Sequence, residues 1–206
     1  MEYNLDEIEF VKAVVLSGFK ADIQVQVTVK LKQAIDAENI QVKLVSNFMG
    51  FNQIDKRWVD KYVTMWDIPN DITQLLKEYT GELPPRINNP KDKRRTFANE
   101  FSEKDQRKLL TWLQNNKSLI VSDVLKGRGK FSAEWMLVAQ KTDTHARWIL
   151  KPMNYCLNFF GNGDVLISPR GTLKIGKITM QRKGGDGGRS TANMLQFKIN
   201  PAELFE

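Results

Sequence analysis

The feature that most constrains the fold is a nearly perfect alternation of apolar and polar residues over residues 21–31, ADIQVQVTVKL. Successive side chains of a strand point to opposite faces, so this pattern predicts a β-strand with one apolar face. A polar connector, KQAIDAEN, follows, and residues 39–47, NIQVKLVSN, alternate again. We therefore predict an antiparallel hairpin whose apolar faces contact the core, with Gln41 and Lys43 together on the polar face of its second strand.

Helical signals follow the hairpin. Apolar residues have helical spacing over residues 55–79, with an interruption at Pro69. Ser102 and Asp105 have the spacing of a capping box, which predicts a helix over residues 102–116. The middle of the chain therefore contributes helices.

The two ends of the chain are less uniform. Residues 5–16 combine a helical start with an apolar finish, and residues 132–140 fit either a helix or a strand. From residue 163, strands surround a Pro-Arg-Gly turn, and the glycine-rich KGGDGGR precedes a last strand, NMLQFKIN. We predict an α/β fold, a mixed sheet flanked by helices, in a single domain over residues 1–206. The tryptophans are predicted to lie in the core: Trp58, Trp66, Trp112, Trp135 and Trp148.

Composition excludes several kinds of chemistry. The single cysteine, Cys156, and the single histidine, His145, rule out an internal disulfide, a cysteine zinc cluster, a two-histidine metal site and a histidine-paired nucleophile. A formal charge of +7 favours a polyanionic partner. No apolar run is long enough to span a bilayer and the N-terminal residues are acidic, so we expect a soluble, cytoplasmic protein without a membrane partner.

A candidate catalytic motif links the two strands of the predicted hairpin. Asp22 opens the first strand and Gln41-Val42-Lys43 lies on the second, a variant of the acidic, acidic-x-lysine pattern of metal-dependent nucleases. The Asp22 carboxylate, the Gln41 amide oxygen and the Val42 carbonyl offer hard oxygen ligands for Mg²⁺, which polarises a scissile phosphate. Lys43 can orient or deprotonate the attacking water. Gln41 stands where the pattern usually has a carboxylate, so the site has one negative charge fewer. We therefore expect the metal to bind best with DNA present, because the substrate phosphate can supply that charge.

This motif has two weaknesses. If Asp22 faces Gln41, the turn should centre near residues 31 and 32, earlier than the polar connector, and a bulge would reconcile the two positions. The same letters also occur twice more in the chain: as Asp164 with Gln181 and Lys183, and as Asp186 with Gln196 and Lys198. The well-patterned strands favour the first motif. Glu134 opens an apolar segment and is predicted to be structural, with a supporting catalytic role as the alternative.

Longer stretches carry a family resemblance. NLDEIEFVKAVVLSGFKADIQVQVTV, IQVKLVSN, GFNQIDKRW, TGELPP, KDKRR, ARWIL, SPRGTL, QRKGGDGGR and TANMLQFKINPAELF resemble, from end to end of the chain, the HinP1I family of type II restriction endonucleases. The resemblance implies a restriction-endonuclease-like core and Mg²⁺-dependent cleavage of double-stranded DNA within GCGC, leaving short 5′ overhangs. It implies that Asp22, Gln41 and Lys43 are catalytic, and that Phe51 and Gln53 insert into DNA at the target.

The resemblance also indicates a difference. The family has a helical segment ahead of the point where this chain begins, so we expect that segment to be absent here. A catalytically impaired DNA-binding protein is therefore one alternative, and a metal-dependent nuclease for a different DNA substrate is another. The residues leave open whether two copies associate as a homodimer. Phe51 could also be an ordinary core residue.

Basic runs indicate where DNA would bind. They are KDKRR at 91–95, LKGRGK at 125–130 and the glycine-containing segment 169–189. Any one of them could simply be a solvated face. Together they favour a DNA surface, because lysine and arginine neutralise phosphates and glycine lets backbone approach closely. Our candidates for base or phosphate contact are Gln181, Arg182, Lys183 and Arg189.

Overall fold

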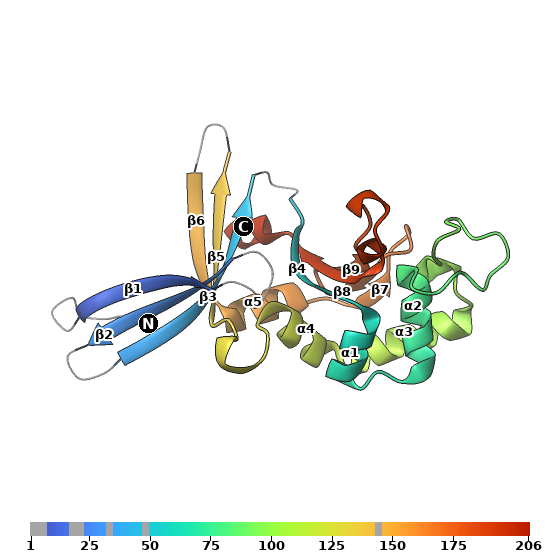
Figure 1. Cartoon of the computed structure of the whole chain (residues 1–206), viewed down its shortest axis with the longest axis horizontal. Helices are drawn as coiled ribbons and strands as arrows, with labels where there is room; N and C mark the ends of the chain where they lie inside the picture. Colours follow the sequence, from blue (N-terminus) through green and yellow to red (C-terminus); the bar gives the residue numbers. More distant parts are fainter. Residues whose placement is uncertain (1–7, 17–22, 32–34, 47–49, 143–145) are drawn as a thin grey trace. The chain divides into compact units, whose positions relative to one another are not determined.

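The computed structural model describes residues 8–16, 23–31, 35–46, 50–142 and 146–206. Contacts divide the chain into two compact units. Unit 1 comprises Met1–Asn52, Leu125–Leu157 and Asn200–Glu206, and unit 2 comprises Gln53–Val124 and Asn158–Ile199. Each unit contains one five-stranded sheet, so the predicted α/β class is confirmed (Figure 1). The expectation of a single domain over 1–206 stays a prediction.

The sheet of unit 1 is mixed. Its strands, in spatial order, are β1 (Ile8–Leu16), β2 (Ile23–Leu31), β3 (Ile35–Val45), β5 (Trp135–Lys141) and β6 (Ala146–Pro152). Neighbouring strands are antiparallel except β3 and β5, which are parallel. The segment over residues 8–16, for which the sequence suggested a helical start, is therefore a strand.

The predicted hairpin is β2 and β3. Gln24 lies opposite Gln41, and the antiparallel register runs without a shift from Ile23 to Lys30. No bulge is needed in that ladder, because β3 begins at Ile35, inside the segment that we predicted to be the connector. The strand is longer and the turn shorter than the composition suggested, since Asp36, Ala37 and Glu38 pair within the ladder despite their low strand propensity.

The buried face of β3 is the reverse of the prediction. Gln41 and Lys43 are 3% and 1% exposed, whereas Leu44, on the apolar face, is 69% exposed. The register places Leu44 beside Ala139 and Ala139 beside Trp148, which is 73% exposed. The core assignment of Trp148 is therefore wrong. Alternation shows that two faces differ, but it does not show which face other segments cover.

The cover on the polar face comes from distant parts of unit 1. The 3-10 helix η6 (Pro201–Phe205) contacts β3 and β5. The Arg147 guanidinium lies 4.1 Å from the centre of the Phe205 ring. Arg147 pairs with Gln140, and Gln140 pairs with Val45, two residues beyond Lys43 on the same face. This places η6 over the side of the sheet that carries Gln41 and Lys43.

Unit 2 joins a second sheet to a helical layer. The sheet has the order β4 (Asn52–Arg57), β10 (Leu195–Ile199), β9 (Ile178–Arg182), β8 (Leu173–Ile175) and β7 (Val165–Ile167). The helices are α1 (Val59–Trp66), α2 (Asn70–Thr80), α3 (Glu103–Asn115) and α4 (Lys117–Leu125). Helix α5 (Met153–Gly161) and α4 each cross the boundary between the units. The expected strands after residue 163 are confirmed, whereas β4 and α4 were not predicted.

Two of the predicted helix boundaries are confirmed in unit 2. The break at Pro69 separates α1 from α2, and Asp67 ends α1 in a left-handed conformation at φ 48°. Ser102 caps α3, and its hydroxyl oxygen accepts a hydrogen bond from the Asp105 backbone N–H at 3.1 Å. Local chemistry therefore fixed these boundaries.

Aromatic side chains form the centre of the unit 2 core. Tyr62 stacks on Trp66 with ring centres 4.6 Å apart, and both meet the Phe197 ring edge-on. The Trp66 indole N–H donates a 2.7 Å hydrogen bond to the buried Asp123 carboxylate, which satisfies both groups. This packing fixes α1 against the sheet. Among the helices in the described part of the chain, none has the length and apolarity needed to cross a membrane.

Candidate active site and DNA-binding residues

The Gln41-Val42-Lys43 segment lies in the middle of the unit 1 sheet. β3 is hydrogen-bonded to β2 on one side and to β5 on the other, and Gln41 lies between Gln24 and Met136. Strand alternation places the Gln41 and Lys43 side chains on one face. A lysine is almost never buried so completely unless other groups compensate its charge, so this position is unusual for a structural residue.

The Gln41 amide oxygen has the properties of a metal ligand. It is buried and accepts no hydrogen bond from any residue that the structure describes. Leaving a buried acceptor unpaired costs about 1–3 kcal/mol, so such an atom needs an explanation, for which a bound water or ion is one candidate. A hard divalent cation would satisfy this oxygen. The Gln41 oxygen therefore fits the Mg²⁺ that the sequence pattern implies.

The acidic member of the motif is not placed. Asp22 lies outside the described residues, so its part in the site stays a prediction. Within the described ranges, no three His, Cys, Asp or Glu side chains are grouped so that they could hold a metal ion. Neither of these findings identifies an alternative metal site.

Glu134 connects backbone segments in unit 1. Its carboxylate accepts a hydrogen bond from the Asn39 N–H at 3.3 Å, and its own N–H donates to the Asn39 carbonyl at 2.8 Å. The Glu134 carbonyl accepts a further bond from Met153 at 2.7 Å. These contacts join β3 to the segment before β5 and to the start of α5, which supports the structural interpretation of Glu134.

The two competing motifs both lie in unit 2. Gln181 on β9 pairs with Gln196 on β10. The Lys183 ammonium forms a 2.7 Å ion pair with Asp186, and the Thr191 hydroxyl donates a hydrogen bond to the same carboxylate. The hydrogen bond from Lys183, followed by that from Thr191, lowers the pKa of Asp186 to about 2. In the structure, Lys183 and Asp186 therefore brace the glycine-rich loop.

The other predicted DNA-binding residues are placed as follows. Phe51 is 49% exposed, so it is not a core residue. Gln53 is half-buried in β4. Arg182 donates to the Asn193 side-chain oxygen at 3.0 and 2.7 Å, and Arg189 is exposed on the loop that follows. Their contacts with DNA remain predictions.

Sequence reasoning missed a second polar pair on the face of Gln41. Gln140 is buried, and its side-chain oxygen accepts a 2.7 Å hydrogen bond from the Arg147 Nε–H. Both residues lie in or near apolar stretches, and only the β3–β5–β6 register brings them onto the same face as Gln41. The available signal was weak, because Gln140 stands at the end of the apolar run WMLVA and is followed by Lys141.

Comparison with known proteins places the chain in the restriction endonuclease class. The chain superposes on the crystal structure of restriction endonuclease MspI in complex with its cognate DNA, with a TM-score of 0.65 and 14% sequence identity, over 95% of this chain and 72% of that chain. At this identity the match establishes the fold. The family of R.HinP1I restriction endonuclease matches residues 1–205, and the chain belongs to it. It is a type II site-specific nuclease. No curated protein sequence gives a significant match.

Proposed function

We propose that this chain is a Mg²⁺-dependent endonuclease that cuts double-stranded DNA at GCGC and leaves short 5′ overhangs. The observation that carries the proposal is the buried Gln41 amide oxygen without a hydrogen-bond partner among the described residues, two positions from the buried Lys43. The target sequence and the overhangs rest on the resemblance of the long motifs to the family. We place the reaction in the cytoplasm.

The residues have separate roles in this proposal. The Asp22 carboxylate, the Gln41 amide oxygen and the Val42 carbonyl hold the metal ion, which supplies positive charge at the scissile phosphate. The Lys43 Nζ orients the attacking water and moves its proton. Its ammonium form offsets the negative charge that develops on the phosphate. The only histidine, His145, lies outside the described residues.

Binding of the target involves other parts of the chain. Phe51 and Gln53 act at the target base steps, where an apolar wedge separates stacked bases. The exposure of the Phe51 side chain supports this role. Gln181, Arg182, Lys183 and Arg189 contact bases or phosphates beside β9.

Association of two copies is part of the proposal. The apolar face of the unit 1 sheet exposes Val11, Val15, Leu44, Trp148 and Leu150. Contiguous exposed apolar residues on a soluble chain mark an interaction surface. A homodimer that buries this face would remove it from water.

The test is digestion of a plasmid with and without Mg²⁺, followed by sequencing of the product ends. We expect cleavage only within GCGC and only with the metal. Asp22→Ala and Lys43→Ala should lose cleavage and still bind DNA, whereas Lys198→Ala, which removes a lysine from the competing Q-x-K on β10, should still cut. Cleavage by Lys43→Ala together with a folded but inactive Lys198→Ala would move the site to unit 2.

The rival functions give different results in the same assay. A DNA-binding protein without nuclease activity would leave the plasmid intact with every divalent metal. A nuclease for branched or single-stranded DNA would require the metal but would cut such substrates in preference to GCGC duplexes.

A further inference from the structure

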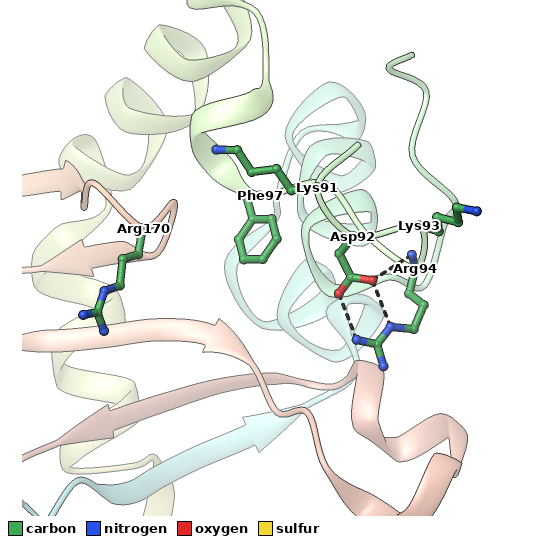
Figure 2. A pocket seen from close by; sticks show the side chains of 6 residues that line it. All are labelled: Lys91, Asp92, Lys93, Arg94, Phe97 and Arg170. Carbon is green, nitrogen blue, oxygen red and sulfur yellow. Dashed lines mark hydrogen bonds and ion pairs between the residues drawn. The ribbon is translucent and has the colours of Figure 1, made fainter. Parts of the chain in front are cut away.

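The basic run 91–95 of unit 2 is organised by one carboxylate. Asp92 accepts hydrogen bonds from the Arg94 backbone N–H at 3.1 Å, from Arg94 Nε at 2.9 Å and from Arg94 Nη2 at 3.1 Å. The Arg95 Nε lies 3.7 Å from the same carboxylate, and the Arg95 N–H donates to the Asp92 carbonyl. Figure 2 shows the Arg94 guanidinium folded against Asp92. A single acidic residue therefore orients two arginines.

The two arginines differ in exposure. The Arg95 side chain is 18% exposed and lies with its guanidinium 4.0 Å from the centre of the Phe97 ring, a cation–π contact. The Arg94 side chain is 71% exposed, so part of its donor fork faces solvent. Arg95 thus anchors the turn, and Arg94 is presented at the surface.

Arg170 reaches the same pocket from a rigid turn. Gly171 ends this turn at φ +75°, and a Cβ there would lie 2.5 Å from Asn99 Oδ1 and 2.7 Å from Phe97 Cβ. The Gly171 carbonyl accepts a hydrogen bond from Ala98, and the Asn99 amide donates to the Pro169 carbonyl at 3.0 Å. Only glycine fits this approach, and it fixes the backbone from which Arg170 projects.

These cations form one continuous surface. Lys91, Lys93, Arg94 and Arg170 line a pocket of about 730 Å³ with Phe97 and Asp92 (Figure 2). Lys93 and Arg94 also line a second pocket, of about 570 Å³, with Arg182 and Arg189. We call these six cationic residues the basic surface. The two pockets contain only two carboxylates, Asp92 and Glu82, which leaves a net charge of +4.

The second pocket is also built on fixed backbone. Arg182 is held by Asn193, whose amide donates to the Gly81 carbonyl at 2.7 Å. Gly185 and Gly188 line the pocket with positive φ angles, and a Cβ added to either would meet nothing within 4 Å. Burial, together with the nearby Arg94 and Arg95, lowers the pKa of Arg182. Several cations are therefore held close together beside open space.

We propose that the basic surface binds backbone phosphates of double-stranded DNA, and that Asp92 is the positioning residue that aims Arg94 at them. Small-molecule sites are mostly apolar cavities with a few polar groups, whereas the first of these pockets is lined mainly by charged side chains and the second by cations and glycines, as an extended polyanion requires. An arginine that is already held in place can bind phosphate through its remaining N–H groups and loses less side-chain freedom on binding. The choice of DNA as the polyanion rests on the proposed function.

The first test measures binding to a labelled duplex without GCGC, in the absence of divalent metal, by fluorescence anisotropy between about 50 and 200 mM salt. Each phosphate contact contributes about 0.9 to the slope of log affinity against log salt, so Lys93→Ala/Arg170→Ala should lower the slope by roughly 2. Its affinity near 0.1 M salt should fall by a factor of several tens.

A matched control separates position from net charge. Lys61→Ala/Arg107→Ala removes the same charge from exposed positions on α1 and α3, outside both pockets. We expect its slope and affinity to change by less than half as much on a logarithmic scale. Equal losses in the two double variants would overturn the proposal, because charge alone would then account for binding.

The second test uses the sign of the Asp92 effect. Asp92→Asn makes the chain more positive, so charge alone predicts tighter binding. If Asp92 positions Arg94, the same change should weaken binding by about tenfold, the loss of one phosphate contact. In an Arg94→Ala background it should then change affinity little. Tighter binding by Asp92→Asn at an unchanged melting temperature would refute the positioning role.

These measurements are independent of cleavage. If the wild-type chain binds the duplex through this surface but cuts no DNA, the proposed function fails and the present inference stands. If it cuts GCGC and the double variant has unchanged affinity, KM and kcat, the present inference fails alone. We expect the double variant to have a raised KM and an unchanged kcat at low salt.

Discussion

The Gln41 amide oxygen gives a prediction in which stability and activity change in opposite directions. Gln41→Met keeps the length of the side chain and removes a buried acceptor that has no hydrogen-bond partner in the described structure. An unpaired buried acceptor lowers the free energy of unfolding by about 1–3 kcal/mol, and the substitution restores only part of this. We expect the free energy of unfolding to rise by about 1 kcal/mol, which raises Tm by about 2–4 °C in a chain of this size. Cleavage should be abolished.

Gln140 provides the matched control on the same face of the sheet. It is as buried as Gln41; its side-chain oxygen accepts a hydrogen bond from Arg147, and its amide Nε2 has no hydrogen-bond partner among the described residues. Gln140→Met removes that hydrogen bond but also removes the unpaired Nε2 donor, and the exposed Arg147 can bond to water instead, so the free energy of unfolding should change by less than about 1 kcal/mol. Cleavage by the folded fraction should be retained. The same chemical change at the two glutamines should therefore differ in its effect on cleavage.

The measurements are thermal unfolding and plasmid cleavage on the same preparations. A third readout is the rise in Tm on adding Mg²⁺ together with a GCGC duplex, since a ligand that binds only the folded state stabilises it. Gln41→Met should reduce this rise by the part that the metal contributes. If Gln41→Met instead lowers the free energy of unfolding by more than about 1 kcal/mol, Gln41 has structural partners and our reasoning is wrong. Retained cleavage would contradict it as directly.

Three further predictions concern other parts of the chain. Phe51→Ala should lower the free energy of unfolding by less than about 1 kcal/mol, because the side chain is half exposed. It should reduce cleavage of GCGC while binding to scrambled duplexes stays unchanged. A large loss of Tm would contradict the wedge role. Burial raises the pKa of Glu78, and its carboxylate pairs with the largely exposed Arg86 at 2.5 Å. Arg86→Ala should therefore lower the free energy of unfolding by about 1–2 kcal/mol at pH 7. Removing Arg86 raises the pKa of Glu78 further, so the stability lost by Arg86→Ala, measured by thermal unfolding, should be smaller at pH 5, where Glu78 gains a proton. An equal loss of stability at pH 7 and pH 5 would refute this. Sedimentation should show self-association that Leu44→Lys or Trp148→Lys weakens, whereas a monomeric wild type would exclude association through this face.

Local signals in the sequence predicted the elements that local chemistry determines. The β2–β3 hairpin follows from strict alternation, and the break at Pro69 and the Ser102 cap follow from backbone geometry and hydrogen bonding. β4 was missed, and only its last three residues fell in the helical pattern that begins at residue 55, because NQIDKR is short and mostly polar. α4 was missed because several of its sides are apolar and it has no clear polar stripe.

The position of each face of the sheet could not be predicted in this way. Gln41 and Lys43 were correctly placed on one face, but that face was expected to meet solvent. Whether a face is buried depends on segments far along the chain, and here Phe205 and its neighbours cover the side that carries them. The same limit applied to the basic surface, because nothing local shows that Arg170 shares a pocket with Lys91.

A glutamine in place of a carboxylate is consistent with such a buried position. A second carboxylate on this face would be costly to bury without its metal, whereas a neutral amide leaves only one unpaired oxygen at about 1–3 kcal/mol. The protein can therefore fold before the metal arrives. The same exchange removes one negative charge from the metal site, and phosphate oxygens of the substrate are the nearest replacement. Tight metal binding would then require DNA. Because the basic surface lies in unit 2 and the Q-x-K strand in unit 1, affinity for DNA and chemistry would depend on different residues, and the variants described above separate them.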